Sequence, residues 1–405
     1  MTSKEFERVV FTELAGEPGP VPAGLFTLDL DLGVGRFQYG RRYLQRANAI
    51  PLDPVNLPLT GAEYLTRKNH GIFGVIGDVL PDSWGRYILA KERNVPFGAL
   101  RDYEFIDLAS TQTVGALSFG ATPDQPTSKA REAVSLAELG EVARLFERAM
   151  AEEPLPPEIL YLLRQGTSLG GAQPKCPVNI DGEAWIAKFA SSKTVVKYPA
   201  IEFATMTLAA KSGIRVPEIR LEVVGGRAVF LIKRFDRVAG ARIPFLSAMA
   251  VSDLDVDELE QASYPELAGR MRKFVENVQM EQHELFRRMA FNMHVRNEDD
   301  HPRNHGFIYR NGWSLSPAFD ILPMPARAGS ATFHLALQVG DFGSEASLQN
   351  LLSRHERFSL TRKEAMTIIL EVRDSLTNWE QEMRRAGVSR PDLESIRWSF
   401  AGFRR

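Results

Sequence analysis

Short apolar runs that alternate with polar residues fill the first 120 residues of the chain. Val9-Val10-Phe11 and residues 25–30 are two of these runs, and a turn rich in glycine and proline at residues 16–20 separates them. Alternation bounded by turn residues is typical of antiparallel strands. Further elements are expected as a hairpin over residues 31–43, a helix over residues 84–93 capped by Asp82 or Ser83, and a strand over residues 115–120. The chain is therefore expected to begin with a strand-rich module.

The pattern changes after an expected linker at residues 121–130, which contains two prolines. Ser135 and Glu138 form a capping box that opens a helix with one apolar face. That face consists of Leu139, Val142, Leu145, Phe146 and Ala149. The elements expected next are a strand over residues 183–190, a helix over residues 199–212, and strands over residues 218–224 and 227–232 joined by a Gly225-Gly226 turn.

The remainder of the chain is expected to be helical. Leu285, Met289 and Met293 form a core-facing stripe, and a second capping box from Thr361 to Glu364 opens another helical pattern. That pattern continues through Ile369, Val372, Leu376, Trp379 and Met383. The fold class predicted from these patterns is α+β.

Composition narrows the class of protein. The chain has 405 residues, enough for two or three domains, and its formal net charge of −2 gives no basic excess that would suggest a nucleic-acid partner. A single cysteine, Cys176, excludes an internal disulfide framework. The sequence shows no signal-peptide core and no uninterrupted apolar window of eighteen residues. We therefore expect a cytoplasmic protein with no membrane partner.

The segment from His294 to Asn304 carries the strongest chemical signal. It places three acids, two histidines and two amides directly after the apolar stripe, and Pro302 prevents the helix from continuing. Asp299 is followed five residues later by Asn304 and, farther on, by Asp320. Phosphoryl-transfer enzymes use such an arrangement to accept the substrate hydroxyl proton and to hold magnesium. The alternative is an ordinary solvated acidic loop.

Residues 166–175 form a glycine-rich segment that ends at Lys175. Small residues let backbone amides approach a phosphate, and a lysine adds a matching charge. Pro174 separates the glycines from Lys175, so the segment is not a Walker A loop, and a plain turn remains an alternative.

In the following strand, Lys188 shares a face with Ile186, which favours either a phosphate-binding lysine or an edge-strand lysine. Glu202 could steady Lys188 or could simply favour a helix N-terminus. The charged stretch over residues 233–237 could form a hinge between two lobes. Glycine loop, lysine strand, helix, hairpin and hinge follow one another in the order of a kinase small lobe.

Several motifs together resemble the HipA family of toxin kinases. They are residues 168–175, Ile186-Ala187-Lys188, Arg234-Phe235-Asp236-Arg237, the pattern Asn297-x-Asp299-x-His301-x-x-Asn304, and Phe319-Asp320. Residues 80–86 and 114–117 resemble the N-terminal subdomain of that family. The resemblance implies a protein-kinase-like two-lobed fold. Its parts would be an N-terminal strand-rich subdomain (1–125), a small lobe with the Gly-rich loop (126–236) and an all-helical C-terminal lobe (237–405).

The resemblance also implies a serine/threonine protein kinase that uses ATP and Mg²⁺. Asp299 would be the catalytic base, His301 would lie near the transferred phosphate, and Asn304 and Asp320 would hold the metal. The residues implied to bind ATP are Gly170, Gly171, Ala172, Gln173, Lys175, Lys188, Lys233, Arg234, Phe235, His301, Asn304 and Asp320. Ser168 matches a serine that is autophosphorylated in the family, where its added charge would push the loop away from the site.

Partners follow from the same resemblance. They would be a HipB-like helix-turn-helix antitoxin, DNA only indirectly through that antitoxin, and a protein substrate carrying Ser or Thr, with an aminoacyl-tRNA synthetase among the family's targets. A small-molecule or lipid-type kinase and a non-catalytic ATP-binding corepressor are alternatives.

The chain departs from the family pattern at five positions. Pro174 replaces an acid in the glycine-rich loop, Arg303 replaces a lysine, and Lys233 stands where the hinge is expected to have an acid. Glu298 and Asp300 place extra acids beside Asp299, which could alter metal affinity or the charge preference for substrates.

Overall fold

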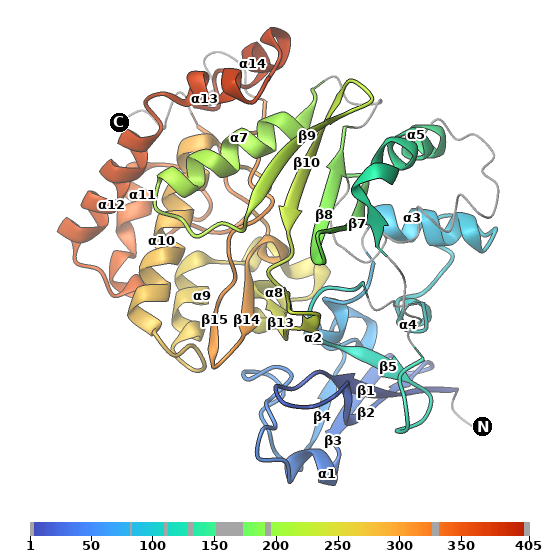
Figure 1. The fold of residues 1–405 in the computed structure, drawn as a ribbon. Coiled ribbons are helices and arrows are strands. Elements are labelled where there is room, and N and C mark those ends of the chain that lie inside the picture. The colour runs from blue at the N-terminus through green and yellow to red at the C-terminus, as the bar shows by residue number, and fades with distance from the viewer. Residues whose placement is uncertain are drawn as a thin grey trace. The chain divides into compact units, whose positions relative to one another are not determined.

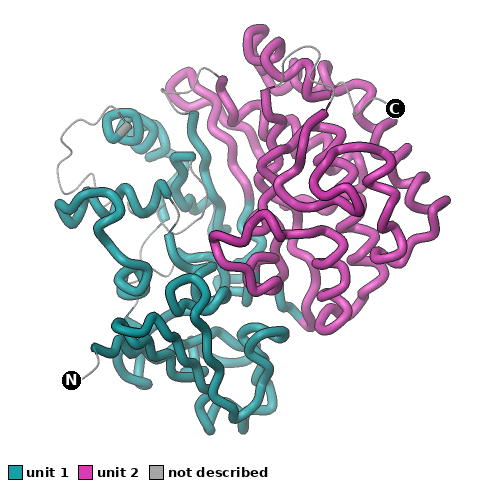
Figure 2. Tube along the Cα trace, turned by 180° about the vertical axis from the view of Figure 1, so that it is seen from behind, with its two compact units in different colours: residues 1–191, 233–246, 308–310 teal, residues 192–232, 247–307, 311–405 magenta. Residues whose placement is uncertain are grey.

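The computed structural model describes residues 4–81, 83–108, 112–127, 133–150, 173–190, 196–325 and 332–400 (Figure 1). The chain divides into two compact units (Figure 2). The first contains residues 1–191, 233–246 and 308–310, and the second contains residues 192–232, 247–307 and 311–405. The three-part division expected from the sequence stays a prediction.

The first unit begins with an antiparallel sheet of five strands in the order β4-β3-β2-β1-β5. Their bounds are β1 Glu5–Thr12, β2 Val21–Asp29, β3 Val34–Tyr39, β4 Glu63–Thr66 and β5 Ser118–Gly120. Phe26 and Phe37 face each other across β2 and β3, and both side chains are buried. The strand-rich module predicted for the start of the chain is confirmed.

Short helices follow β3 and β4 within this unit. They are α1 Arg41–Leu44, η1 Lys68–Gly71, α2 Gly74–Gly77, α3 Ser83–Glu92 and α4 Asp102–Ile106. The helix predicted over residues 84–93 is α3, which buries Trp84, Ile88 and Leu89. Of the two candidate caps, Ser83 is the first residue of α3, and Asp82 lies outside the described residues.

The rest of the first unit contains β6 Val134–Ser135, η2 Leu136–Glu138, α5 Leu139–Met150, β7 Lys175–Ile180 and β8 Glu183–Phe189. The Ser135–Glu138 capping box is present, and the predicted apolar face of α5 is buried. β7 pairs in parallel with β6 and antiparallel with β8. Trp185, Ala187 and Phe189 are buried, as expected for one face of a period-two strand. The unit also includes the two-stranded ribbon β11 Arg237–Val238 and β12 Ala241–Arg242.

The second unit opens with α7 Tyr198–Lys211 and the hairpin β9 Ile219–Val224 to β10 Arg227–Lys233. Gly225 and Gly226 have φ of 59° and 80°, so both residues adopt the left-handed conformation that a tight hairpin turn of the primed type requires. Glu202 is fully buried beyond the first turn of α7, so the structure does not support its role as a helix-terminus charge.

Helices dominate the remainder of the second unit. They are α8 Ala248–Ser252, η3 Val256–Gln261, α9 Tyr264–Met271, α10 Val278–Val295, η4 Pro302–Asn304, α11 Leu348–Ser353, η5 His355–Phe358, α12 Arg362–Ser375, α13 Trp379–Arg385 and α14 Arg390–Ile396. Thr361 caps α12 as predicted, but the apolar pattern that follows spans two helices, α12 and α13.

The α+β fold class is confirmed, but residues 237–405 are not purely helical. Besides the β11–β12 ribbon they contain the short strands β13 Phe245–Ser247, β14 Gly306–Tyr309 and β15 Trp313–Leu315. Each of these three strands has only three or four residues, which is too short for an alternating apolar and polar pattern to be recognised in the sequence.

Candidate phosphoryl-transfer site

The acidic loop follows directly after helix α10. Leu285, Met289 and Met293 are fully buried along it, as the sequence predicted. The helix stops at Arg296, whose φ of 54° is left-handed, and the N–H of Asn297 returns to the carbonyl of Asn292 at 2.8 Å. The loop therefore begins immediately after a rigid buried element.

The three acids of the loop occupy three different environments. Glu298 forms an ion pair with Arg296, and Asp300 is buried with 1% of its surface exposed. Asp299 remains exposed. Of the two extra acids, one is thus paired with an arginine and the other is buried, and their predicted effect on metal affinity or on the charge preference for substrates stays a prediction.

Asp299 interacts electrostatically with two predicted site residues. Although the side chain is exposed, its partial desolvation by the surrounding loop is the main cause that raises its pKa above the usual value; the neighbouring Asp320 also raises it, while His301 acts in the opposite direction. The fold thus brings His301 and Asp320 each within electrostatic range of Asp299. A carboxylate whose pKa is raised accepts a proton more readily than an ordinary aspartate.

Asn304 is oriented by the loop itself. It ends the single turn η4, and its Nδ2 donates to the backbone carbonyl of Asp299 at 2.9 Å. Because the amide nitrogen is used there, the amide oxygen is the atom that can face a cation.

Asp320 adopts a left-handed backbone, with φ of 59°. For a residue with a side chain this conformation is strained, so the surrounding structure must hold it in place. Arg288 on α10 contributes by donating to the carbonyl of Ser316 at 2.7 Å, with its own charge balanced by Glu284. Helix α10 therefore supports both loops of the candidate site.

Asn304 and Asp320 line the same small cavity, which has a volume of about 10 Å³. This space is sufficient for about one water molecule or ion. Among the described residues, no group of three His, Cys, Asp or Glu side chains could hold a metal alone. Magnesium typically takes one or two protein ligands and completes its shell with water and substrate phosphates. One carboxylate and one amide oxygen fit that requirement.

The predicted phosphate-binding lysines lie in the first unit. Lys175 on β7 pairs in register with Lys188 on β8, and their exposed fractions are 4% and 6%. Residues directly opposite in antiparallel strands point to the same face, so the two lysines lie on one face of the sheet. Gln173 precedes β7. The other glycine-loop residues, Ser168, Gly170, Gly171 and Ala172, lie outside the part of the chain that the structure describes.

The predicted hinge contains side chains that are already engaged. Lys233 contacts Glu183 at 2.5 Å. Arg234 is buried and donates to both carboxylate oxygens of Asp236, at 2.9 and 2.7 Å. The ring of Phe235 lies against that of Phe245, with centroids 6.3 Å apart. Main-chain groups of this stretch are paired as well, since the N–H of Arg234 donates to the Ala184 carbonyl at 2.9 Å and the carbonyl of Phe235 accepts from Arg310 at 3.2 Å. The Arg234 guanidinium is therefore not available to adenine, and the adenine-binding role of the hinge stays a prediction.

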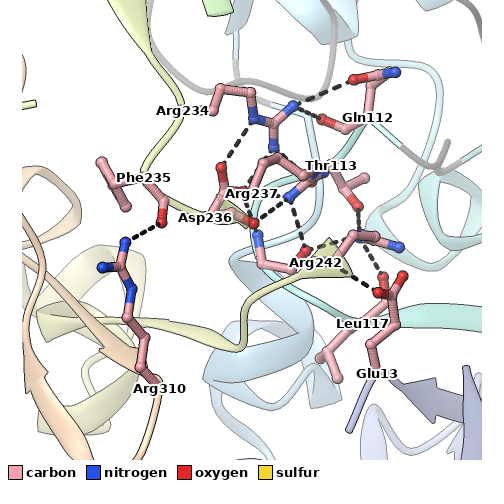
Figure 3. A network of polar contacts seen from close by, with 11 residues as sticks. Glu13, Gln112, Thr113, Leu117, Arg234, Phe235, Asp236, Arg237, Arg242 and Arg310 are labelled. Atoms are coloured by element: carbon pink, nitrogen blue, oxygen red, sulfur yellow. Dashed lines mark hydrogen bonds and ion pairs between the residues drawn. The ribbon is translucent and has the colours of Figure 1, made fainter. Parts of the chain in front are cut away.

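Arg234 belongs to an arginine network that sequence reasoning missed (Figure 3). Arg237 also pairs with Asp236, and Arg242 donates to Thr113 Oγ1 at 2.7 Å and to the carbonyl of Leu117 at 2.9 Å. Glu13 accepts from the backbone N–H of Arg242 at 2.7 Å. The partners that this network finds outside residues 234–242 are more than 120 residues away, so no local pattern could have indicated them.

A second group that the sequence did not reveal surrounds Asp300. The hydroxyl of Tyr264, at the start of α9, donates to Asp300 Oδ2 at 2.5 Å. The two residues are 36 positions apart, and Tyr264 carries no sequence signal of a role in the loop.

Two family models match the chain. The HipA-like C-terminal domain matches residues 167–379, and the HipA N-terminal domain matches residues 20–120. The first match alone spans more than half of the chain, and the second confirms the resemblance found for the leading module.

Two curated proteins with kinase names are similar to part of the chain. A Haemophilus influenzae protein named "Putative kinase" is 29% identical over 207 residues, which is 45% of this chain and 60% of that protein. A Sinorhizobium fredii protein named "Putative kinase Y4dM" is 30% identical over 160 residues, which is 36% of this chain and 39% of that protein. The chain thus spans less than two thirds of the length of either relative.

A solved structure shares the fold. It is the HipA, HipB and operator DNA complex of the Shewanella oneidensis toxin-antitoxin system, matched with a TM-score of 0.68 over 96% of this chain and 95% of that one, at 17% identity. None of the helices formed by the described residues is long and apolar enough to cross a membrane. On the combined match of both domain models, the chain belongs to the HipA-like family.

Proposed function

We propose that this protein is an ATP- and magnesium-dependent serine/threonine protein kinase. The single observation that carries the proposal is the grouping of Asp299, His301, Asn304 and Asp320 on two loops supported by α10. The kinase names of the partial relatives agree with it. A corepressor without catalysis would have no need for an exposed base beside two oxygen ligands.

In the proposed reaction, Asp299 accepts the proton of a substrate Ser or Thr hydroxyl. The hydroxyl oxygen forms a bond to the γ-phosphorus of ATP while the bond from that phosphorus to the β,γ-bridging oxygen breaks, and ADP leaves with the bridging oxygen. The proton remains on Asp299, whose raised pKa favours this transfer. His301 would lie near the phosphate that moves.

The remaining proposed roles are metal binding and nucleotide binding. Asn304 and Asp320 would hold Mg²⁺, which when bound neutralises charge on the nucleotide phosphates. Lys175 and Lys188 would contact the phosphates, together with Gln173 and the backbone of Gly170, Gly171 and Ala172. The main chain of Lys233, Arg234 and Phe235 would hold adenine.

We further propose that the kinase is the toxin of a HipA–HipB-like module. A helix-turn-helix antitoxin would be its partner, and DNA would be reached only through that antitoxin. Support comes from the fold that this chain shares with a chain of the HipA, HipB and operator DNA complex of Shewanella oneidensis. Its substrate would be a protein carrying Ser or Thr, and Ser168 would be its autophosphorylation site.

Magnesium-dependent nucleotide binding tests the metal ligands. Calorimetric titration of the wild-type chain with ATP should give about tenfold or more tighter binding with magnesium than without it, as expected for a ligand that needs the ion to bridge its phosphates. Asp320→Asn should remove most of that difference. Asp341→Asn, which changes an exposed aspartate paired with Arg354, serves as the control and should leave it intact. Equal magnesium dependence in Asp320→Asn and the wild type would contradict the assignment.

A further inference from the structure

A buried hydrogen-bond network holds the residue next to the proposed base. Tyr264 is fully buried, and its hydroxyl donates to Asp300 Oδ2 at 2.5 Å. The same hydroxyl accepts from Asn292 Nδ2 on α10 at 2.9 Å and lies 3.3 Å from His305 Nε2. The other carboxyl oxygen of Asp300 accepts the N–H of Ala336 at 2.7 Å. Asp300 is thus connected to α9, to α10 and to the segment that contains Ala336.

These contacts constrain Asp299 without using its side chain. The side chain of Asp300 is fixed by its hydrogen bonds, and Asn304 donates to the carbonyl of Asp299, which belongs to the peptide that joins Asp299 to Asp300. The Asp299 side chain nevertheless remains exposed. The network therefore restrains the backbone from which the proposed base projects and leaves the carboxylate accessible to a substrate.

Burying a carboxyl group is costly, and the cost shows in the pKa of Asp300, which burial raises to about 7. An apolar residue at this position would fill the space without that cost. The hydrogen bonds of Asp300 therefore suggest a requirement for a defined loop geometry. A displacement of about 1 Å at a reacting group can lower a rate by about 100-fold, so this geometry matters for catalysis.

We propose that Tyr264 and Asp300 are positioning residues that fix the main chain of Asp299 for phosphoryl transfer. This inference rests on the proposed kinase function. Neither side chain is placed at the reacting atoms, since both act through the backbone of the loop. Their loss should affect turnover more than nucleotide binding.

The test compares two substitutions that each remove one buried tyrosine hydroxyl. Tyr264→Phe breaks the network, and Tyr43→Phe removes a hydroxyl that donates to the Ile50 carbonyl at 2.7 Å in the other compact unit. Phosphate transfer from ATP to the chain itself is followed at varied ATP concentration with saturating magnesium. Tyr264→Phe should lower kcat about 10- to 100-fold with KM for ATP changed less than about twofold, as for other outer residues that orient catalytic ligands. Tyr43→Phe should leave kcat unchanged while lowering the melting temperature by a similar amount.

Asp300→Asn provides a second, independent test of the positioning role. It keeps the shape of the side chain and the acceptor for Ala336, but it replaces the oxygen that accepts from Tyr264. Because the two residues act as a unit, the double variant should lose no more kcat than the worse single variant. If Tyr264→Phe fails to fold, Asp300→Asn alone carries the comparison with Tyr43→Phe.

The possible outcomes distinguish the positioning role from the kinase function. Transfer by Tyr264→Phe or Asp300→Asn at the rate of the control would overturn the positioning role while leaving the kinase proposal in place. A loss divided equally between kcat and KM would also overturn it, because general loosening of the fold would explain both. Absence of ATP binding and of transfer in the wild-type chain would overturn the kinase function and this inference with it.

Discussion

His294, near the end of α10, is a buried residue whose titration should be visible in the stability of the protein. Burial first, and the charge of Arg373 second, lower its pKa to about 4. The unfolded chain therefore binds a proton near pH 6.5 while the folded chain does not. The free energy of unfolding should fall as pH decreases from about 6.5 to about 4, by up to about 3 kcal/mol from this residue.

Denaturant unfolding at several pH values measures the effect. His294→Phe should reduce the loss of stability between pH 6.5 and pH 4, since the substituted residue cannot take up a proton. His334→Phe, an exposed position, should leave the slope unchanged. An identical slope in His294→Phe and the wild type would show that other groups control the acid sensitivity.

At this scale the sequence predicted the exposed chemistry better than the buried support. Asp299 and Asn304 lie five residues apart in one loop, so their spacing, together with the other motifs, suggested a catalytic role, which stays a prediction. The orientation of Asp300 could not be predicted, because it depends on Tyr264 and Ala336, which are each 36 residues away. Adjacent acids in a sequence can face opposite environments, and only the fold decides which one is buried.

Among the elements, the ribbon β11–β12 depends on a buried charge network. Asp236 is 3% exposed and pairs with both Arg234 and Arg237. Burial alone would raise its pKa. The pKa is instead held below the usual range, because the two arginines and the backbone N–H of Gly115 stabilise the charged carboxylate. The ribbon is thereby connected to residues 112–117, and its position depends on the aspartate.

Asp236→Asn should destabilise the protein by about 3–5 kcal/mol, the usual cost of leaving buried charges without their partner. Thermal or denaturant unfolding measures the change. Asp374→Asn removes an exposed partner of Arg373 and should cost less than about 0.5 kcal/mol. Similar small losses in both variants would show that the network is not important for stability.

Elements with local signals were predicted well, and those that depend on distant partners were not. The capping boxes at Ser135 and Thr361 and the Gly225-Gly226 turn encode their structures within four residues. Strands β13 and β15 have three residues each and form only because other strands pair with them. The arginine network was missed for the same reason, since Arg234 meets Gln112 and Thr113 only in the folded chain.

At the scale of the whole molecule, the order of motifs along the chain was more informative than any single motif. The glycine-rich segment, the lysine strand and the acidic loop indicated the family, and the two domain matches confirm it. Composition excluded some classes of protein but could not indicate the family, because a net charge of −2 and a single cysteine are ordinary values. The residues proposed for phosphate binding and for catalysis lie in different compact units.

Phosphate transfer by the complete chain is the most direct test of the kinase proposal. The wild type and Asp299→Asn are each incubated with ATP and magnesium, and intact mass followed by peptide mapping records any phosphate gained. We predict that the wild type gains a phosphate at Ser168 and that Asp299→Asn, which keeps the size of the side chain but cannot accept the hydroxyl proton, gains none. Equal phosphorylation of both proteins would contradict the assignment of Asp299 as the base, and a wild-type chain that neither gains phosphate nor binds ATP would contradict the kinase function itself.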